Sequence, residues 1–359
     1  MKLLYLINYA GSGGTERYVE LLAKYYHNNK CSCGLCYNIG GPLVEKLKNL
    51  GIPVYQLEMK SILDLAAAKK LAKLCADEGY DVIHAQFPRE NYIAILSKIF
   101  GCKAKVIFTS HLILEQPPIW KLLNRIFTPK NHAVLTVCTY GREVLERNGV
   151  AKDKIHIVFN GVDAAAAPER DRSILREFGI GDEEKVITIL TRFAEETGVP
   201  FLLRSMAKLK ETTAVPFRLL LVGTGPDFDR DKELVSQLGL EDHVILTGFR
   251  IDTATLLAAS DLYLNSSSSE AMSFAILEAL AAGLPLVLTD VGGNPELVNT
   301  GEPCGLLVPY GDEDAYAAAI AKLLEDAALR LRYAAAAKAK AAREFDLYNL
   351  LNELFEIYK

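Results

Sequence analysis

The chain has 359 residues, half of them hydrophobic and about a quarter charged, which suits two globular domains of roughly 150 residues each and excludes a disordered or fibrous protein. No apolar run approaches the roughly 20 residues needed to span a bilayer. The net charge is −5, but residues 1–170 hold 22 Lys and Arg against 15 Asp and Glu, and the remainder holds 18 against 30. A basic first half suggests an anionic partner for that half, although two solvated surfaces can also differ in this way by chance.

The first half alternates short apolar runs with amphipathic stretches. Its start, Met1–Asn8, leads into a glycine-rich turn rather than a cleavage site, so we interpret it as a strand and not as a signal peptide. Seven cysteines, mostly in apolar surroundings, indicate buried thiols in a reducing cytoplasm, and Cys31, Cys33 and Cys36 fit strand packing better than a metal or redox site. The expected strands are 2–7, 53–57, 81–84, 104–109 and 133–137, and the expected helices include 15–27, 61–78 and 91–100.

The alternation starts again after a looser stretch at 163–183. The expected strands are 185–191, 217–222, 243–247, 261–265 and 284–289. The expected helices are 198–211, 228–238, 253–259 and 273–282, and the tail 313–359 is helical. Strands that alternate with helices predict parallel sheets covered on both faces, so the fold class is α/β with two doubly wound units in tandem. Ligands in such sheets bind at the carboxyl ends of the strands.

Two glycine-rich turns follow expected strands. The first, Gly11–Arg17, opens a helix, where backbone N–H groups attract anions. It is not G-x-G-x-x-G, because Glu16 occupies the third glycine position, and this disfavours a dinucleotide. A phosphate-binding turn and a tight turn without a ligand remain equally open. In the second turn, Leu221–Pro226, we expect Pro226 and Asp227 to start a helix, and we favour a plain turn.

The most informative segment is 266–285. A strand ends there, a polar loop carries Glu270, and Ser273 is placed to cap a helix that begins near Phe274 and ends at Gly283. The position of Glu278, one turn inside this helix, lets both carboxylates border one pocket. The helix N–H groups could bind a diphosphate there, and the acids could accept hydrogen bonds from sugar hydroxyls. Two solvated surface acids are the alternative, which fits the apolar neighbours of Glu278 poorly.

This segment resembles the E-x7-E signature of retaining GT-B glycosyltransferases, in particular carbohydrate-active family 4. Other segments resemble the same family in the same order: the first loop at Gly13–Arg17, the hinge at Ile157–Asp163, the stretch Val291–Val298, and the closing motif Gly305–Pro309 with Gly311 and Asp312. The resemblance implies the GT-B fold, two Rossmann-like domains that face a central cleft. Residues 1–165 would form the acceptor-side domain and 166–340 the nucleotide-sugar domain, and 341–359 would be a helix that packs back on the first domain.

The resemblance also implies a role for each matching residue. The catalytic residues would be Glu270 at the donor sugar, Arg192 at the departing diphosphate and His111 near the transferred sugar. A strand-end histidine satisfied locally remains the alternative for His111. The donor-binding residues would be Gly13, Gly14, Thr197, Arg250, Ile251, Met272, Ser273, Phe274 and Glu278, the last on the ribose. On the acceptor side we place Thr15 and Glu16 of the first loop, and Trp120 from its place in an amphipathic segment of the first domain.

One position departs from the family pattern. The family places an Arg and a Lys on the leaving group in a pattern like G-R-x-x-x-x-K-G, and this chain has Thr197 where the Lys is expected. A cation there offsets leaving-group charge, so its loss could lower the rate by orders of magnitude. A non-catalytic or impaired sugar-nucleotide binding protein is therefore one alternative.

The chemistry that the resemblance implies is retaining transfer without a metal or other cofactor. The acids at 229–231 and 312–314 have D-x-D spacing, but we interpret them as loop or helix-start acids. The segment Pro117–Phe127 mixes apolar, aromatic and basic residues at helical spacing. On a basic domain it could rest on an anionic membrane, close to a lipid-linked acceptor. An ordinary amphipathic helix with its apolar face in the core is slightly favoured.

We therefore expect a cytoplasmic enzyme, peripheral to the membrane at most, with no nucleic-acid partner. It would transfer a sugar from a nucleotide sugar, a UDP-sugar by preference, to a glycan or lipid-linked acceptor in bacterial surface polysaccharide or glycolipid synthesis. A nucleotide-sugar epimerase and a dinucleotide-dependent oxidoreductase are the rival enzymes, and the second lacks its glycine signature at 11–16.

Overall fold

The computed structural model describes residues 1–11 and 13–359, which divide into two units. The first unit comprises Met1–Phe159 and Leu351–Lys359, and the second comprises Asn160–Leu350. The division falls before Asn160, slightly earlier than the expected 165/166. The reason is that the hinge segment pairs within the second unit, where Val162 forms a parallel bridge with Asp346.

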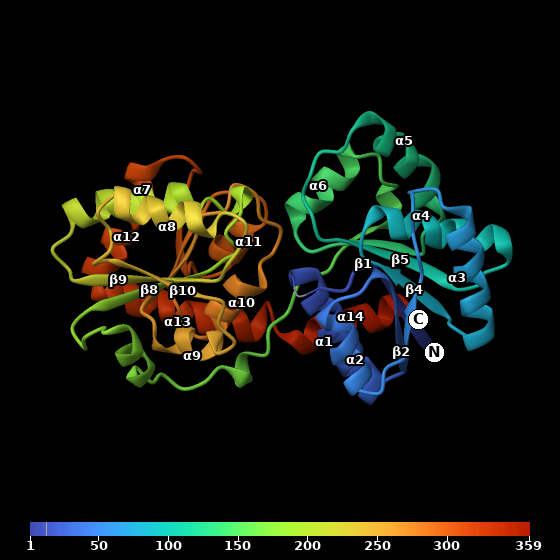
Figure 1. Ribbon diagram of the computed structural model, residues 1–359, viewed down its shortest axis with the longest axis horizontal. Helices are drawn as coiled ribbons and strands as arrows, with labels where there is room; N and C mark the ends of the chain where they lie inside the picture. Colours follow the sequence, from blue (N-terminus) through green and yellow to red (C-terminus); the bar gives the residue numbers. More distant parts are fainter. Residues whose placement is uncertain (12) are drawn as a thin grey trace. The chain divides into compact units, whose positions relative to one another are not determined.

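The first unit is built on a parallel sheet, which among the described residues has the order β3-β2-β1-β4-β5-β6-β7 (Figure 1). Its strands are β1 Lys2–Tyr9, β2 Ser32–Ile39, β3 Val54–Gln56, β4 Val82–Ala85, β5 Lys105–Ser110, β6 Ala133–Thr136 and β7 Ile155–Ile157. Its helices are α1 Gly14–Asn29, α2 Pro42–Asn49, α3 Leu65–Glu78, α4 Pro88–Ser97, α5 Pro118–Phe127 and α6 Thr139–Arg147. The last helix, α14 Leu347–Tyr358, enters this unit from Leu351 onward.

Alternate strand residues of the first unit face opposite layers, as the two-residue period of a strand requires. Leu4, Leu6 and Val106 lie in a buried cluster with residues of α3, α4 and α5. On the other face lie α1 and α14 (Figure 1). The Tyr26 hydroxyl of α1 donates to the carbonyl oxygen of Leu351 in α14. The end of α14 is thus part of the core of the first unit.

The second unit has a parallel sheet of order β10-β9-β8-β11-β12-β13 in the described chain. Its strands are β8 Lys185–Leu190, β9 Phe217–Val222, β10 Val244–Gly248, β11 Leu262–Asn265, β12 Leu286–Thr289 and β13 Gly305–Val308. Its helices are α7 Val199–Thr212, α8 Phe228–Gln237, α9 Thr253–Ala259, α10 Phe274–Ala281, α11 Asn294–Asn299, α12 Glu313–Glu325 and α13 Ala327–Arg343. In Figure 1, α7, α8 and α12 lie on one face of this sheet, and α9, α10 and α13 lie on the other.

The α/β fold class and the parallel sheets are confirmed. The expected helix 228–238 begins where α8 begins, at Phe228, so Pro226 and Asp227 precede the helix rather than start it. The strands β2, β7 and β13 were not among the expected strands. The sequence of β13 predicts a strand only weakly because it begins with a glycine. A Cβ atom at Gly305 would lie 2.4 Å from the carbonyl oxygen of Leu286. Close packing demands a glycine there, and glycine is a poor strand former.

Both sheets reverse their strand order at one point, between β1 and β4 in the first unit and between β8 and β11 in the second. Ligands of open α/β sheets bind outside the carboxyl ends of the strands at such reversals. The loops after these four strands are therefore where each unit can hold a ligand.

Candidate functional site

The loop after β1 carries Gly13 and Gly14, and the neighbouring Ser12 lies outside the described residues. The N-cap of α1 is Gly13, which has no side-chain cap, and Thr15 and Glu16 stand partly exposed in the first turn. A Cβ atom at Gly14 would meet no heavy atom within 4 Å, and one at Gly13 would meet only the flexible Glu16 carboxylate. Packing inside the unit therefore demands a glycine at neither position, which leaves room for an external ligand to approach the backbone.

The glycine turn after β9 is different. A Cβ atom at Gly223 would lie 1.9 Å from the carbonyl oxygen of Thr191, and one at Gly225 would lie 2.2 Å from that of Phe193. The backbone at Gly223 also has a φ of 136°, which disfavours other residues. Internal packing accounts for both glycines, as the interpretation of a plain turn requires.

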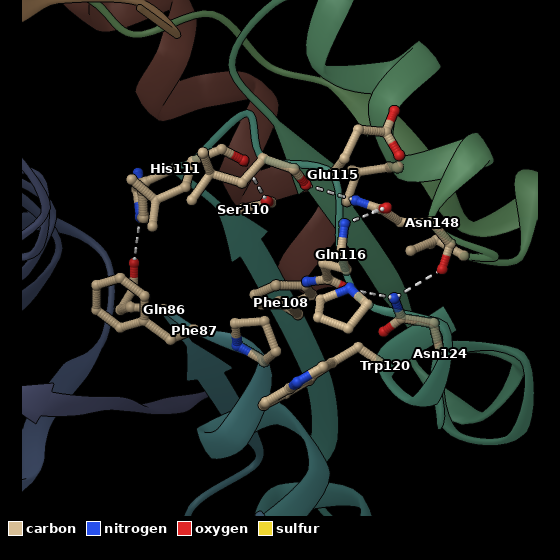
Figure 2. Close-up of a pocket in the computed structure, with 16 residues that line it drawn as sticks. Gln86, Phe87, Phe108, Ser110, His111, Glu115, Gln116, Trp120, Asn124 and Asn148 are labelled. Carbon is tan, nitrogen blue, oxygen red and sulfur yellow. Dashed lines mark hydrogen bonds between the residues drawn. The ribbon is translucent and has the colours of Figure 1, made fainter. Parts of the chain in front are cut away.

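The residue directly after β5 is His111. Its Nε2 lies 2.8 Å from Oε1 of Gln86, which follows β4 (Figure 2). Its ring also packs edge to face on Tyr18, with 4.9 Å between the ring centroids. Because Nε2 of Gln86 donates to the carbonyl oxygen of His84, its Oε1 accepts from His111. Burial lowers the pKa of His111 to about 3, so the ring is neutral near pH 7. Its Nδ1 is then a hydrogen-bond acceptor, suited to a sugar hydroxyl.

A second histidine, His84 of β4, anchors α14. Its Nδ1 lies 2.8 Å from the Tyr358 hydroxyl and its Nε2 lies 2.7 Å from the Thr109 hydroxyl. Burial lowers its pKa to about 3, with a smaller contribution from His111. This neutral polar network lies directly behind Tyr18, the ring that packs on His111.

In the second unit, the loop after β8 carries Arg192 and Thr197. The exposed Arg192 guanidinium forms an ion pair with Glu196. The Thr197 hydroxyl lies 2.7 Å from the carbonyl oxygens of both Arg192 and Ala194, so it stabilises its own turn. The expected donor contact of Thr197 would compete with these bonds.

This loop is fastened to the loop after β11. The Ser266 hydroxyl donates to the carbonyl oxygen of Thr197 at 2.8 Å, and the Ser268 N–H donates to that of Glu196 at 2.9 Å. The αL residue Gly198 packs against the carbonyl oxygen of Ser266, where a Cβ atom would lie at 2.1 Å. The two strand ends that flank the reversal of the sheet are therefore held together by hydrogen bonds.

Glu270 lies on the loop that follows β11. Its Oε2 is 3.4 Å from both Nδ2 of Asn265 and the hydroxyl of Ser267. Burial raises the pKa of Glu270, while these two donors lower it in part. The carbonyl oxygen of Glu270 accepts from the N–H of Gly293, which fixes the loop. The carboxylate is thus held in place by short side chains that sequence reasoning did not single out.

The second acid, Glu278, is partly exposed on α10, whereas its neighbours Leu277 and Ala279 are buried. Burial raises the pKa of the Tyr263 phenol, and the charges of Glu278 and Glu270 raise it further. Ser273 occupies the N-cap position, but its side chain makes no cap hydrogen bond, so the expected capping is wrong. Met272 is buried, and its carbonyl oxygen accepts from Nδ2 of Asn160 at 2.9 Å.

Residues 249–251 follow β10 and expose two apolar side chains, with Ile251 92% exposed. Arg250 does not face outward as a free donor. It pairs with Asp252 through Nε and Nη2, at 2.8 and 2.7 Å, and with Glu177. We interpret its role as holding the loop, so that Ile251 is the better candidate for contact with a nucleobase.

The residue Trp120 lies on α5, where it packs at 5.9 Å from Tyr92 and lines a pocket that begins at His111 (Figure 2). The core face of α5 carries Leu123 and Phe127. A second apolar row, Ile119, Leu122 and Ile126, is 50–56% exposed, and we call it the outer stripe. No described helix is both long and apolar enough to cross a bilayer.

Metal ligands are not gathered anywhere in residues 1–11 and 13–359: no group of three His, Cys, Asp or Glu side chains could hold an ion. Asp229 and Asp231 lie in the first turn of α8, and Asp312 caps α12. A metal-free reaction stays a prediction.

The expected residues are divided between the two units. Arg192, Thr197, Glu270 and Glu278 belong to the second unit, and Gly13, Gly14, His111 and Trp120 belong to the first. Sequence reasoning missed Gln86, Tyr18, Asn265 and Ser267, which hold the functional side chains. A polar residue two positions beyond the end of a predicted strand was the available signal for Gln86 and Ser267.

The two doubly wound parallel sheets are those of the GT-B fold, and the chain belongs to family 4 of the glycosyltransferases. Residues 12–166 match the model of Glycosyltransferase Family 4, and residues 171–340 match that of Glycosyl transferases group 1.

Named relatives agree with this class. N-acetyl-alpha-D-glucosaminyl L-malate synthase of Bacillus anthracis is 32% identical over 82% of this chain and 78% of its own. UDP-Gal:alpha-D-GlcNAc-diphosphoundecaprenol alpha-1,3-galactosyltransferase of Escherichia coli is 23% identical over 92% of this chain and 89% of its own. Among solved structures, HepE of Anabaena in complex with UDP has a TM-score of 0.85 at 24% identity over 99% of both chains, which shows the shared fold.

Proposed function

We propose that this glycosyltransferase moves a sugar from a UDP-sugar to a glycan or lipid-linked acceptor, with retention of configuration at the anomeric carbon. The observation that carries the proposal is the loop after β11, beside the reversal of the second sheet, where Asn265 and Ser267 hold Glu270 at 3.4 Å and Glu278 follows one turn inside α10. Ligands bind at this edge, and two acids there suit the hydroxyl groups of a sugar and a ribose. A fold neighbour solved with UDP supports the choice of base.

The departing diphosphate would be held by Arg192 and the backbone of Met272–Phe274 at the start of α10. Arg192 must then leave Glu196, which the high exposure of both side chains permits. A cation and a helix N-terminus offset leaving-group charge without a metal. The leaving oxygen would take the acceptor proton on the same face of the sugar, and neutral His111 would accept a hydrogen bond from a hydroxyl.

For the acceptor, we propose a glycan or lipid-linked sugar of bacterial surface polysaccharide or glycolipid synthesis. The relatives from Escherichia coli and Campylobacter jejuni act, by their names, on diphosphoundecaprenol-linked sugars. The malate synthase name shows that the family also includes small acceptors. The outer stripe of α5, with the exposed bases Arg125 and Lys130, supports contact with an anionic membrane from the cytoplasmic side.

One observation favours a second candidate. The hydroxyl of Thr197 is engaged in its own turn and carries no charge, so the donor would bind without efficient turnover. A protein of this kind would bind a sugar nucleotide and release no product.

Thermal shift against a panel of nucleotides and nucleotide sugars tests the donor site. A ligand at about 100 times its Kd adds roughly 2.7 kcal/mol of stability. We expect UDP-sugars to raise the Tm, Glu278→Ala to abolish the shift, and Glu211→Ala, an exposed acid at the far end of α7, to retain it. A panel in which no nucleotide sugar shifts the Tm, or in which Glu278→Ala responds like wild type, would contradict this donor site.

Membrane contact is tested separately by sedimentation with vesicles. The protein should sediment with anionic phosphatidylglycerol vesicles and not with neutral phosphatidylcholine vesicles, because basic side chains flank the outer stripe. Leu122→Ser should weaken retention. Equal binding to both lipids, or none, would refute the contact.

A further inference from the structure

The first unit contains a cavity of about 250 Å³ beneath the loop 111–117, which follows β5. Figure 2 shows His111 at one end of this cavity, with Trp120 along its floor and Asn124 and Asn148 at the other end. Its apolar walls come from Phe87, Phe108, Trp120, Leu145 and Val150. A water molecule takes about 30 Å³, so the cavity holds about eight groups of that size.

The amide side chains at the cavity are already committed to one another. Nδ2 of Asn124 donates to Oε1 of Gln116 and to the carbonyl oxygen of Asn148, and its Oδ1 accepts from Tyr92. Nδ2 of Asn148 donates to the carbonyl oxygen of Leu114, and its Oδ1 accepts from the N–H of Gln116. These bonds hold the loop as a roof over the cavity, so these amides do not offer their polar atoms to a ligand (Figure 2).

Charge also limits what can enter. Among the residues that line the cavity in the described chain there is no Lys or Arg. The one acid, Glu115, forms ion pairs with Lys121 at 3.1 Å and Arg147 at 2.7 Å. A phosphate or carboxylate would find no counter-charge inside, and burying an unpaired charge is costly. The occupant that fits is uncharged and mainly apolar.

Apolar side chains continue from the cavity to the surface. Leu112 and Leu114 of the roof are 57% and 58% exposed, and the outer stripe of α5 follows in the sequence. Leu112 and Leu114 both line the cavity and reach the surface, and exposed apolar side chains at the mouth of a cavity mark an interaction surface. A hydrocarbon chain that reaches the roof from a membrane would exchange one apolar environment for another.

We propose that this cavity binds the hydrocarbon segment of a lipid-linked acceptor that adjoins its head group. The segment enters beneath the loop 111–117 and packs against Trp120, Leu145 and Val150, while the charged head group stays outside. The naming of this lipid as the acceptor rests on the proposed function, but the binding of hydrocarbon does not.

Fluorescence tests the proposal, because Trp120 is the single tryptophan of the chain. The probe is 11-bromoundecyl phosphate below its micelle concentration, since bromine quenches indole fluorescence only at short range. We expect saturable quenching that decyl phosphate reverses and ethyl phosphate does not. Quenching that is absent, or that ethyl phosphate reverses equally well, would overturn the proposal.

Variants locate the probe. Leu145→Phe narrows the cavity and should lower the affinity for the probe at least tenfold. If this variant does not fold, Val150→Leu replaces it, because it adds less volume to the same cavity. Leu122→Ser, on the outer stripe, should keep wild-type quenching while it loses vesicle retention. If the wild-type protein does not bind vesicles but still binds the probe, the proposed membrane contact is refuted, whereas the proposed hydrocarbon binding in the cavity is supported. If Leu145→Phe and Val150→Leu both fold and bind the probe like wild type, the cavity assignment fails.

Discussion

The two units share one strand order around their reversal but differ in the chemistry that follows their strands. In the second unit the loops after β8 and β11 carry charged groups, Arg192 with Glu196 and the partly desolvated Glu270. In the first unit the loops after β4 and β5 carry neutral groups, Gln86 and His111, beside an apolar cavity. The scaffold is common, and the function of each unit lies in its strand-end residues.

This difference indicates a division of work. A diphosphate and its sugar require charge and hydrogen-bond acceptors, which the second unit supplies. An uncharged or lipid-linked acceptor requires neutral and apolar surroundings, which the first unit supplies. This division can be tested with variants that change the charge or the side-chain volume at the strand ends of one unit and leave the other unit unchanged.

The largest expected effect is at Glu270. Glu270→Gln keeps the shape and the contacts to Asn265 and Ser267 but removes the charge. We expect the turnover number to fall about 100- to 1,000-fold, the range for loss of one transition-state contact, with little change in KM for the donor. Steady-state release of UDP in the presence of an acceptor measures it.

The control is a thermal shift with the UDP-sugar, which should persist in Glu270→Gln because the ribose contact at Glu278 is intact. An enzyme that turns over within threefold of wild type would show that the charge on Glu270 is not used. A lost thermal shift with lost turnover would place Glu270 in ground-state binding instead.

The second effect compares glycines of the two units. Gly225→Ala places a methyl group 2.2 Å from the Phe193 carbonyl oxygen, so we expect a loss of about 1–3 kcal/mol in the free energy of unfolding. Gly14→Ala has open space and helical backbone, so its stability should not fall, but its transfer rate should fall at least tenfold if the donor phosphates approach there. Urea unfolding and product formation measure the two effects.

Two outcomes would contradict this comparison. A fully active Gly14→Ala would mean that no ligand approaches the first loop closely. A Gly225→Ala variant as stable as wild type would mean that the turn after β9 relaxes, and that its glycines serve something other than packing.

Most of the fold could be predicted from the sequence, because the helices bury one face and the central strands are continuous apolar runs. The helix 253–259 coincides with α9, and the strands at β1, β5 and β8 lie within three residues of their predicted ends. The missed strand β2 contains Cys, Gly and Asn rather than a run of β-branched residues. Its burial comes from the neighbouring strands β1 and β3, which no local pattern reveals.

The secondary structure around the candidate site was predictable, but the contacts of its residues were not. The sequence placed Glu270 on a loop before a helix and Glu278 one turn inside it, and α10 at Phe274–Ala281 agrees with that placement. The ion pairs of Arg250 with Glu177 and Asp252, and the turn that uses the Thr197 hydroxyl, depend on loops from distant parts of the sequence. Single-sequence reasoning has no access to such pairings.

The third effect is at Thr197. Thr197→Lys should raise the turnover number about tenfold, because a cation would offset leaving-group charge, at a cost of about 1 kcal/mol in stability from the lost hydroxyl bonds. Thr197→Met is the matched control, since it also loses the hydroxyl but adds no charge. If Lys and Met variants turn over equally, charge at this position does not limit the reaction.

The smallest effect concerns the neutral interior of the first unit. His84 has a folded pKa of about 3 and an ordinary value of 6.5, so between these values the unfolded chain binds the extra proton. Stability should therefore fall as the pH falls from 6.5 toward 3, by at most about 1.4 kcal/mol per pH unit from this group. His111 acts in the same direction, and the phenols of Tyr18 and Tyr358 stay protonated throughout.

Urea unfolding at pH 4.5, 5.5, 6.5 and 7.5 measures this slope. Carboxylates contribute to it as well, so the informative quantity is the difference between wild type and His84→Gln, which removes the titrating ring and keeps a polar side chain. The variant should show a shallower slope between pH 4.5 and 6.5 and the same slope above 6.5. Parallel curves would mean that His84 takes up its proton inside the fold, and the network that joins Tyr358, His84 and Thr109 would then be charged rather than neutral.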